Sequence, residues 1–413
     1  MAIDTPARIA VLGAGPIGLE AALYARYLGY DVDLYERGEV AAHVQRWGHV
    51  RMFTPFGLNR STLGLAALRA QHADWQPPAD TTFLTGRAYI DQYLAPLAAS
   101  DLLVDSLHPH TEVLAIAREG WLKSEGGGSE ARADSDFQLL VRTSDSSGHS
   151  HERIVTAEAI LDTTGTFGRH AWLGPSGLPA AGELACEAHI EYGLPDVLGA
   201  DRPRYAGRST LLIGDGDSAA TSLVALAELA SQTSDTWITW VTRPREDAAD
   251  SSPLRTSPGE VGLDVDAAER QRLCLQASRL AADDANHVTH LPRTTVASLT
   301  WHADLDRFTV ELAGEHAGPR EFDRVIANVG YRGDFRLLDE LQVEVCPTTG
   351  APRTLEPGGI ATSEPDFYVL GAKSRGRDGR FLLASGFEQI RQVFAIIGDR
   401  ADLNLYASVA NLV

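Results

Sequence analysis

The sequence predicts an α/β protein with two domains. Two stretches repeat one pattern, in which a short apolar run, a glycine-rich turn and a segment with apolar residues at helical spacing lead into a second apolar run. These stretches span residues 8–35 and 209–242. A chain of 413 residues is also too long for one compact core. We therefore expect two Rossmann-like three-layer nucleotide-binding domains, the second inserted in the first.

The first glycine-rich turn has the spacing of a dinucleotide-binding site. It reads Gly13-Ala14-Gly15-Pro16-Ile17-Gly18 and stands between an expected strand at 8–12 and an expected helix at 19–28. Gly13 permits the tight turn, Gly15 lets the backbone approach a pyrophosphate, and Gly18 lets the helix pack on the strand. Pro16 and Ile17 lead into the helix, whose N-terminus faces the diphosphate. The alternative is a turn that is tight for structural reasons alone.

An acidic residue closes the strand that follows this helix. Glu36 stands 18 residues after Gly18, where a carboxylate accepts both hydroxyls of an adenosine ribose and repels a 2′-phosphate. We therefore expect FAD or NAD at the first turn rather than NADP, and we include the neighbouring Arg37 in the same site.

The second glycine-rich turn reads Gly214-Asp215-Gly216-Asp217-Ser218-Ala219, with alanine at the third small position. Its closing strand ends in Arg243 and Arg245 instead of an acid, and arginine suits a 2′-phosphate. We therefore predict NADPH here, with NADH as the alternative, at Gly214, Gly216, Ser218, Ala219 and Arg243. Against this, Asp215 and Asp217 place two carboxylates where a diphosphate is expected. A structural nucleotide fold with impaired binding stays open.

The remaining segments divide between the two domains. Strands are expected over residues 137–142 and 153–161, with an exposed Gly/Ser/acid-rich tip at 124–136. Residues 174–206 are dense in Gly and Pro, which is typical of a linker. A strand at 366–370 and an amphipathic helix at 386–398 return to the first domain. The predicted boundaries are 1–175 with 357–413 for an FAD-binding domain, 176–206 for the linker and 207–356 for an NAD(P)H-binding domain.

The composition excludes several classes of partner. The chain has 36 Lys and Arg against 56 Asp and Glu residues, a formal net charge of −20 that repels nucleic acid and anionic membranes. No window approaches the roughly 20 apolar residues that cross a bilayer, and no signal-peptide pattern is present. Cys186, Cys274 and Cys346 form no CxxC pair, which excludes a zinc knuckle and a vicinal redox disulfide. We expect a cytoplasmic protein, compatible with a homodimer, that acts on a small-molecule substrate and binds no metal.

Two further motifs accompany the glycine turns. Leu161-Asp162-Thr163-Thr164-Gly165-Thr166 and Ala327-Asn328-Val329-Gly330-Tyr331-Arg332 stand where the chain is expected to pass between the domains. With the two turns, in this order, they resemble the motifs of the two-dinucleotide-binding-domain flavoproteins. That group includes flavin-containing and N-hydroxylating monooxygenases and thioredoxin-reductase-like enzymes. The likeness covers nearly the whole chain and implies FAD in the first domain and NAD(P)H in the second.

The resemblance implies further FAD contacts in the N-terminal part of the chain. Val113, in the pair Glu112-Val113, matches the position whose backbone meets the adenine. Thr164 and Gly165 belong to the first hinge motif. Arg51 and Thr54 match a loop that monooxygenase-like members place against the flavin ring.

The C-terminal segment supplies the other implied contacts. Gly371 ends a strand, and Phe387 and Gln389 belong to the start of a helix that faces the pyrimidine end of the flavin in these families. A helix N-terminus stabilises the negative charge of the reduced ring. Disulfide reductases carry Gly-Asp at the end of that strand, whereas this chain continues from Gly371 to Lys373 and Ser374, which we consider as substitutes for the aspartate.

The resemblance leaves the electron acceptor to be chosen. Because the chain has no cysteine pair for a dithiol relay, we expect oxygen to be the acceptor, with a flavin C4a-hydroperoxide that hydroxylates an amine or sulfur compound. The first alternative is an NAD(P)H-dependent reductase of a quinone, a small disulfide or a protein. The second is a flavin-binding protein with an impaired nicotinamide site. The sequence identifies neither the substrate nor a catalytic acid or base.

Overall fold

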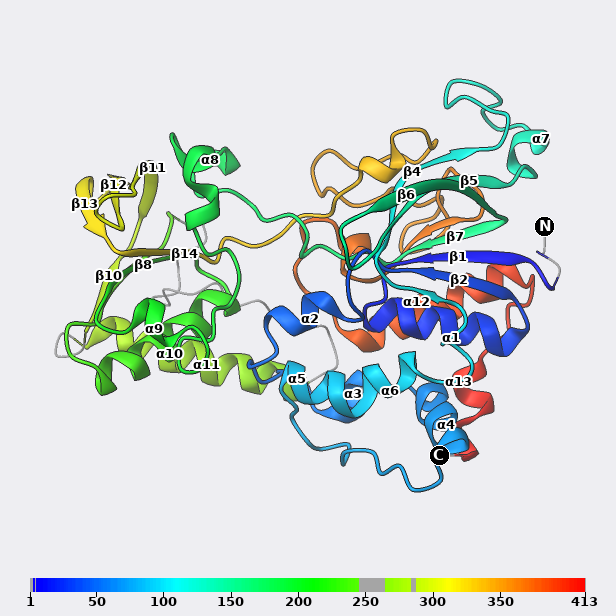
Figure 1. Cartoon of the computed structure of the whole chain (residues 1–413), viewed down its shortest axis with the longest axis horizontal. Coiled ribbons are helices and arrows are strands. Elements are labelled where there is room, and N and C mark those ends of the chain that lie inside the picture. Colours follow the sequence, from blue (N-terminus) through cyan, green and yellow to red (C-terminus); the bar gives the residue numbers. More distant parts are fainter. Residues whose placement is uncertain (1–2, 4, 245–263, 284–286, 413) are drawn as a thin grey trace. The chain divides into compact units, whose positions relative to one another are not determined.

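The computed structural model describes all residues except 1–2, 4, 245–263, 284–286 and 413 (Figure 1). The chain divides into two compact units. Unit 1 comprises Met1–Arg169 and Arg332–Val413, and unit 2 comprises His170–Tyr331. The second unit is therefore inserted in the first, as the sequence predicts.

The parallel sheet of unit 1 is buried on both faces. Its strand order is β15-β7-β1-β2-β3, and its strands are β1 (Arg8–Leu12), β2 (Asp31–Tyr35), β3 (Leu107–His108), β7 (Ala159–Asp162) and β15 (Phe367–Val369). Along β1, Ile9 and Val11 pack into one hydrophobic cluster, whereas Ala10 and Leu12 pack into a second cluster. This two-sided burial explains why the strands read as continuous apolar runs.

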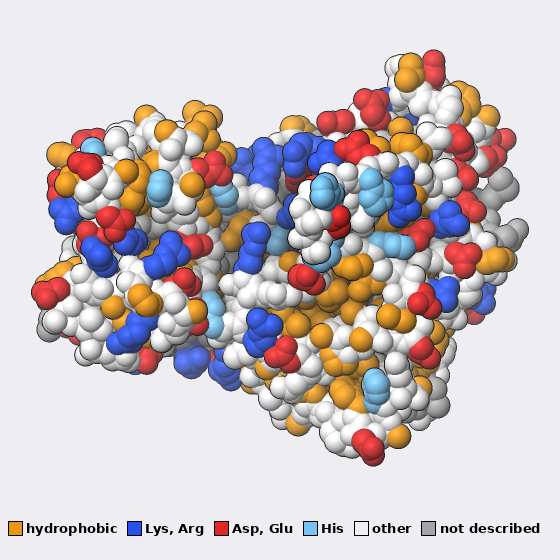
Figure 2. All heavy atoms as spheres, in the orientation of Figure 1, with side chains coloured by type: hydrophobic (Ala, Val, Ile, Leu, Met, Phe, Trp, Pro, Cys, Tyr) orange, Lys and Arg blue, Asp and Glu red, His pale blue; other side chains and the backbone are white. Residues whose placement is uncertain are grey.

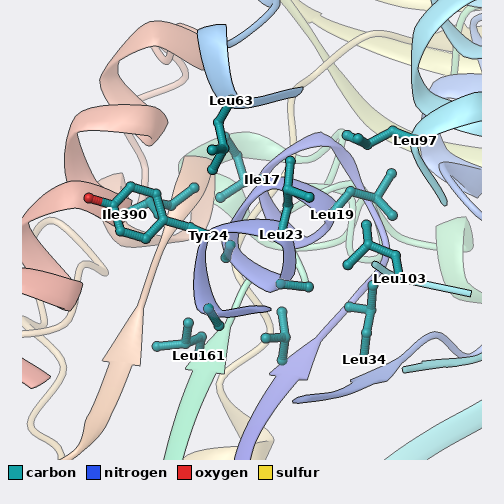
Figure 3. Packing of buried hydrophobic residues seen from close by; sticks show 14 of the residues in the cluster. Ile17, Leu19, Leu23, Tyr24, Leu34, Leu63, Leu97, Leu103, Leu161 and Ile390 are labelled. Carbon is teal, nitrogen blue, oxygen red and sulfur yellow. The ribbon is translucent and has the colours of Figure 1, made fainter. Parts of the chain in front are cut away.

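Helices cover one face of this sheet. The helices α1 (Pro16–Leu28) and α12 (Leu383–Ile397) pack against each other there (Figure 1). Figure 3 shows Leu19 and Leu23 of α1 packed among Leu34 and Leu161 of the sheet and Ile390 of α12. Unit 1 also contains α2 (Ala42–Arg46), α3 (Phe56–Asn59), α4 (Thr62–Gln71), α5 (Gly86–Tyr89), η1 (Ile90–Leu94), α6 (Ala95–Ala98), η4 (Arg336–Leu338), η5 (Gly371–Arg375), α13 (Leu405–Ser408) and η6 (Ala410–Leu412).

An antiparallel sheet packs on the other face. It consists of β4 (Thr111–Arg118), β5 (Phe137–Ser144) and β6 (Ser150–Ala157). Ile116, Leu139 and Val141 of this sheet share a core with Ala10 and Leu12 of β1. Unit 1 therefore has three layers, with helices, a parallel sheet and an antiparallel sheet.

The run 153–161, expected to be one strand, is divided between two sheets. The antiparallel strand β6 ends at Ala157, and the parallel strand β7 begins at Ala159. Glu158 between them is held by Arg8. The Glu158 N–H donates to the Arg8 carbonyl (2.9 Å), and the Glu158 carboxylate accepts from the Arg8 N–H (2.6 Å). The break therefore depends on a contact with a distant part of the chain.

The segment 124–136, expected to be an exposed tip, is anchored to the core. It contains α7 (Glu130–Ala133), and Arg132 in that helix is buried. The carboxylate of Glu364, itself fully buried, accepts hydrogen bonds from Arg132 (2.7 Å) and from Arg118 of β4 (2.8 Å). A buried ion-pair network thus connects this segment to the approach to β15.

Unit 2 repeats the three layers of unit 1. Its parallel sheet has the order β10-β9-β8-β14, and its antiparallel sheet has the order β11-β12-β13. The strands are β8 (Ser209–Ile213), β9 (Trp237–Val241), β10 (Val288–Leu291), β11 (Thr294–His302), β12 (Arg307–Gly314), β13 (Gly318–Phe322) and β14 (Arg324–Ala327). The helices α10 (Asp217–Gln232) and α11 (Asp264–Ala282) contact the parallel sheet, and Leu211 and Val325 pack with Val310 across the two sheets. The predicted fold class is therefore confirmed.

The boundaries of the two units differ from the predicted ones. The range 176–206, expected to be a linker, contains η2 (Pro175–Gly177), α8 (Glu183–Cys186), η3 (Glu187–His189) and α9 (Arg202–Tyr205), and it belongs to unit 2. The reason is the buried Glu183, whose carboxylate accepts from Leu173 N–H (3.1 Å), Ala180 N–H (2.7 Å) and the Tyr192 hydroxyl (2.8 Å). Residues 332–356, assigned to the second domain from sequence, belong to unit 1, where Leu341 joins the core of the antiparallel sheet.

In the part of the chain that the structure describes, no helix combines the length and the apolar character needed to cross a bilayer.

Candidate functional site

The first glycine turn leaves open space beside its middle glycine. Gly13 has φ of +95°, and a Cβ there would lie 3.2 Å from the Thr163 carbonyl oxygen, so this position excludes a side chain. A Cβ added at Gly15, by contrast, would meet no heavy atom of the described residues within 4 Å. Gly15 is the N-cap of α1, and Pro16 follows as the first helical residue. The backbone of the turn is thus exposed at the N-terminus of a helix, where anions bind.

The third glycine and its neighbours bring helices close to the turn. A Cβ at Gly18 would lie 1.8 Å from the Gly13 carbonyl oxygen, so only glycine fits. The Thr163 hydroxyl donates to that same oxygen (2.9 Å), which fixes the turn against β7. Ile17 fills the space between α1 and α12, because its side chain lies 3.6 Å from an ideal Cβ at Gly371 and 2.3 Å from one at Gly386. Gly13 and Gly18 therefore have the conformational and packing roles predicted from their spacing, and the approach of a pyrophosphate to Gly15 stays a prediction.

Glu36 holds the glycine turn in place. One of its carboxylate oxygens accepts from the Ala14 N–H (2.9 Å), and the other accepts from the Gly38 N–H (2.9 Å). Each oxygen keeps a second lone pair for a further donor, such as a ribose hydroxyl. The carboxylate thus combines a structural role, which the sequence did not reveal, with a place beside the predicted ribose.

Arg37 contacts a neutral histidine. Its guanidinium lies 3.3 Å from His43 Nε2. Burial and the positive charges of Arg37 and Arg46 lower the pKa of His43 to about 4, so the ring is uncharged at neutral pH. The exposed side chain of Arg37 is thus held beside His43, next to the strand end that carries Glu36.

A buried ion pair joins the ends of β7 and β15. Lys373 Nζ donates to Asp162 Oδ2 (2.5 Å) and to the Thr164 hydroxyl (3.0 Å), and the side chains of Lys373 and Asp162 are completely buried. Thr164 also donates from its N–H (3.1 Å) and its hydroxyl (2.7 Å) to Asp162 Oδ1. Lys373 is therefore no substitute for the aspartate of disulfide reductases, because its ammonium group is used inside the protein. Gly165 follows with φ of +70°.

The C-terminal segment closes a small ring of hydrogen bonds. The Gly371 N–H donates to Gln389 Oε1 (2.9 Å), Gln389 Nε2 donates to the Ser374 hydroxyl (2.8 Å), and that hydroxyl donates to the Gly371 carbonyl (2.7 Å). Gln389 thus fixes the loop after β15 against α12. The half-buried ring of Phe387 packs toward Tyr406, with ring centroids 6.1 Å apart. Phe387 and Gln389 thus help to position α12, and their contacts with FAD stay predictions.

The loop implied to meet the flavin ring has its own internal contacts. The exposed Arg51 pairs with Thr85 in an isolated bridge and stacks on the ring of Phe83, with the guanidinium carbon 4.4 Å from the ring centroid. The hydroxyl of the buried Thr54 donates to Oδ1 of Asn59, the last residue of α3 (2.8 Å). The side chain of Thr54 is therefore already used within the protein.

Val113 lies on the strand that adjoins Glu36. It is half-buried in β4 and pairs with Val141. The Thr111 N–H, two residues earlier, donates to the Glu36 carbonyl (2.8 Å). The structure therefore brings Val113 to the same end of unit 1 as Glu36, and its contact with an adenine stays a prediction.

The second glycine turn, in unit 2, has the same backbone form. Gly214 has φ of +142°, and a Cβ there would lie 2.3 Å from the Asn328 carbonyl oxygen. A Cβ at Gly216 would meet no described heavy atom within 4 Å. The buried Ala219 would lie 3.1 Å from that Gly214 Cβ, and Ser218 is half-buried in the first turn of α10. This turn also leaves its middle position open.

Arginines accompany both acidic residues of the second turn. Asp215 lies 3.6 Å from the guanidinium of Arg243, and Asp217 forms an ion pair with Arg270 of α11. The carboxylates of Asp215 and Asp217, which would repel a diphosphate, are therefore each accompanied by a positive charge. Arg270 stands 53 residues after Asp217, and no local signal in the sequence pointed to it. Arg245, the other arginine of the predicted 2′-phosphate site, lies outside the described residues.

The three cysteines differ in their surroundings. Burial raises the pKa of Cys186 and of Cys274. The hydroxyl and N–H of Thr349 and the N–H of Thr348 lower the pKa of Cys346, which is partly exposed, to about 7. Among the described residues, no group of three His, Cys, Asp or Glu side chains is placed to hold a metal ion.

Comparison with solved structures shows the same two-unit fold in flavin-dependent enzymes. The chain is similar to bacillithiol disulfide reductase from Bacillus cereus, with a TM-score of 0.68 and 16% identity over 95% of this chain and 99% of that chain. It is similar to ornithine N-hydroxylase from Kutzneria sp. 744, solved with reduced FAD, NADP⁺ and ornithine (TM-score 0.60, 16% identity, 98% and 99% covered). It is also similar to a flavin monooxygenase from Stenotrophomonas maltophilia (TM-score 0.54, 19% identity, 94% and 98% covered).

These likenesses concern the fold, since every identity is below 20%. The chain therefore shares the two-unit fold of these flavin-dependent enzymes, as the motifs predicted. The sequence itself matches no family model and no curated protein.

Proposed function

We propose that this chain is an FAD-dependent oxidoreductase that takes electrons from NAD(P)H. The observation that carries the proposal is the first glycine turn, where Gly15 leaves space at the N-terminus of α1 and Glu36 stands beside it with lone pairs to spare. The residues present fit the diphosphate and ribose of a dinucleotide. The fold shared with flavin-dependent oxidoreductases makes FAD the dinucleotide of choice.

In this proposal the residues of unit 1 bind and orient FAD. The backbone from Gly13 to Gly18 receives the diphosphate, and Glu36 accepts hydrogen bonds from the ribose. Gln389 holds the loop of Gly371 against α12 and so fixes the N-terminus of that helix. FAD, when bound, supplies the flavin that accepts a hydride from NAD(P)H and passes two electrons to an acceptor.

Unit 2 is proposed to bind NADPH in preference to NADH. Arg243 is the exposed basic residue at the end of β9 and suits a 2′-phosphate. Its partner Asp215 competes with that phosphate, so the preference depends on how far the phosphate displaces the carboxylate. The alternative, a nucleotide fold that binds no nicotinamide, is weakened by the ion pairs that balance Asp215 and Asp217.

We propose that oxygen is the acceptor and that a soft nucleophile, an amine or a sulfur compound, is hydroxylated. The chain carries no CxxC pair for a dithiol relay, and two of the similar structures are monooxygenases or hydroxylases. A second candidate is a reductase of a small disulfide. The low pKa of the partly exposed Cys346 and the likeness to a bacillithiol disulfide reductase favour it.

The absorbance spectrum of the purified protein tests the cofactor proposal. The protein should be yellow, and NADPH should bleach the flavin bands without oxygen. Gly15→Ala and Gly216→Ala are a matched pair, because neither new Cβ meets a described atom of the protein. Gly15→Ala should purify without FAD, whereas Gly216→Ala should keep FAD but resist bleaching. A wild-type spectrum that neither NADPH nor NADH alters would refute the proposal.

The acceptor is tested separately. If oxygen restores the bleached spectrum and an amine or sulfide is converted to its oxygenated product, the monooxygenase proposal holds. Fast anaerobic turnover of a small disulfide that Cys346→Ser abolishes would instead support the reductase.

A further inference from the structure

Three arginines from separate parts of the sequence meet in unit 1. Arg169 follows β7, Arg377 follows β15, and Arg332 stands where the chain re-enters the unit. The N–H of Arg332 donates to the Arg169 carbonyl (2.8 Å), which joins two of these segments directly.

The segments share one edge of the parallel sheet. The strands β15, β7 and β1 are parallel neighbours, with Val369 paired with Asp162 and Asp162 paired with Leu12. The loops that follow them therefore leave the sheet at the same carboxyl edge as the glycine turn. In open α/β sheets this edge is where ligands bind.

The backbone of this cluster is fixed. The Arg377 N–H donates to the Thr349 carbonyl (2.8 Å), and a Cβ at Gly376 would lie 2.4 Å from the same oxygen. The loop of residues 371–377 is thus pressed against the turn at 346–351. The arginines of the cluster therefore stand on backbone segments that are fixed by contacts within the protein.

No acidic side chain of the described residues lies within ion-pair distance of Arg169, Arg332 or Arg377, although acidic residues outnumber basic ones by 56 to 36 in the chain. On the face shown in Figure 2, acidic side chains are spread over the surface. The neighbouring Arg380, only three residues after Arg377, is paired with Asp378 (2.8 Å). The cluster thus lacks acidic partners among the described residues, although the protein as a whole is acidic.

The charges of Arg169 and Arg377 act on Arg332. Burial and the charges of Arg377 and Arg169 lower the pKa of Arg332. Like charges held together cost free energy unless an anion neutralises them. Arginine is also the side chain best suited to bind carboxylate and phosphate groups through paired hydrogen bonds.

We propose that Arg169, Arg332 and Arg377 bind the anionic end of the substrate, a small molecule with at least two negative charges close together. That this anion belongs to the substrate rests on the proposed function, whereas the existence of the anion site does not. Carboxylate and phosphate groups share this chemistry, and so do the phosphates of NADPH. An experiment must therefore distinguish a substrate anion from NADPH.

The holoprotein is titrated with citrate in a calorimeter, at constant ionic strength set by chloride so that general screening is unchanged. Arg332→Gln should weaken citrate binding at least about tenfold, since it removes a charge-assisted hydrogen bond. Arg380→Gln is the matched control and should bind citrate as the wild type does. Without citrate, Arg332→Gln should keep or raise Tm because a repulsion is removed.

Citrate binding that is absent, or equal in wild type and Arg332→Gln, overturns the proposal. A fall in Tm of Arg332→Gln with unchanged citrate affinity would show that the cluster is structural. With a quinone as artificial acceptor, a KM for NADPH that Arg332→Gln leaves within about twofold supports the substrate as the source of charge. A rise of about tenfold assigns the cluster to the nucleotide and refutes the substrate proposal. These binding results do not depend on flavin bleaching, so the two proposals fail independently.

Discussion

The buried Glu20 of α1 should make the stability of the protein depend on pH. Its side chain is 1% exposed, and Oε1 has no hydrogen-bond partner among the described residues. Burial raises the pKa of Glu20 from its ordinary value of 4.5 to about 7, even though a hydrogen bond with Ser61 lowers it. The folded protein therefore favours the uncharged carboxyl group. Glu20→Gln replaces it with a group of similar shape that stays uncharged at every pH.

The size of the effect follows from the change in pKa. A rise from 4.5 to about 7 in the pKa of Glu20 corresponds to about 3 kcal/mol, at about 1.4 kcal/mol for each pH unit. Because the pKa is raised on folding, this stabilisation is fully present below pH 4.5 and is lost as the pH rises through 7. The unfolding free energy of Glu20→Gln relative to wild type should therefore increase by up to about 3 kcal/mol between pH 4.5 and pH 8. A cost of the new amide group would shift the whole curve without changing its slope.

The measurement is urea unfolding of both proteins at a series of pH values, with the midpoint and slope fitted at each pH. Glu340→Gln is the control, because Glu340 is exposed and should give a difference that does not vary with pH. A flat difference for Glu20→Gln across this range would show that the Glu20 carboxyl group is not driven to its uncharged form by burial.

Three further predictions concern single side chains. Gly18→Ala should lower the unfolding free energy by about 1–3 kcal/mol or more, because its Cβ would lie 1.8 Å from the Gly13 carbonyl oxygen; an unchanged urea midpoint would contradict this. Lys373→Met should cost about 3–5 kcal/mol because it leaves Asp162 buried and unpaired; adding Asp162→Asn should recover part of the loss, and a double variant no more stable than the single one would refute the pairing argument. Cys346 should react with iodoacetamide with a midpoint near pH 7, since its pKa is lowered to about 7; mass spectrometry of the labelled peptide checks this, and a rate that keeps rising to pH 9 would disagree.

The folds of the segments proposed to bind nucleotides were predictable because their signals are local. The strand β1, the turn from Gly13 to Gly18, and α1 follow from glycine spacing and apolar periodicity within 30 residues. The break at Glu158 was not predictable, since 153–161 reads as one strand and the bend depends on Arg8. Likewise, low periodicity indicated a linker at 176–206, but the buried Glu183 ties that segment into unit 2.

The candidate site divides in the same way. Glu36 could be found from its spacing to Gly18, whereas its bonds to the turn required the structure. From the sequence, Lys373 is a candidate ligand for the flavin. Its actual partner, Asp162, could not be recognised because it is 211 residues away. Charges that are satisfied by distant residues look free in a sequence.

The strand order of unit 1 has a consequence for synthesis on the ribosome. The last of the described strands, β15, pairs with β7, and between them the whole of unit 2 is translated. Until Lys373 emerges, Asp162 lacks its partner, and α12 is absent from the face of β1 and β7. The inserted unit can complete its own core while the apolar face of β1 and β7 in the first unit is still uncovered. Nascent chains that end near residue 340 should therefore bind chaperones more strongly than released chains that extend through α12.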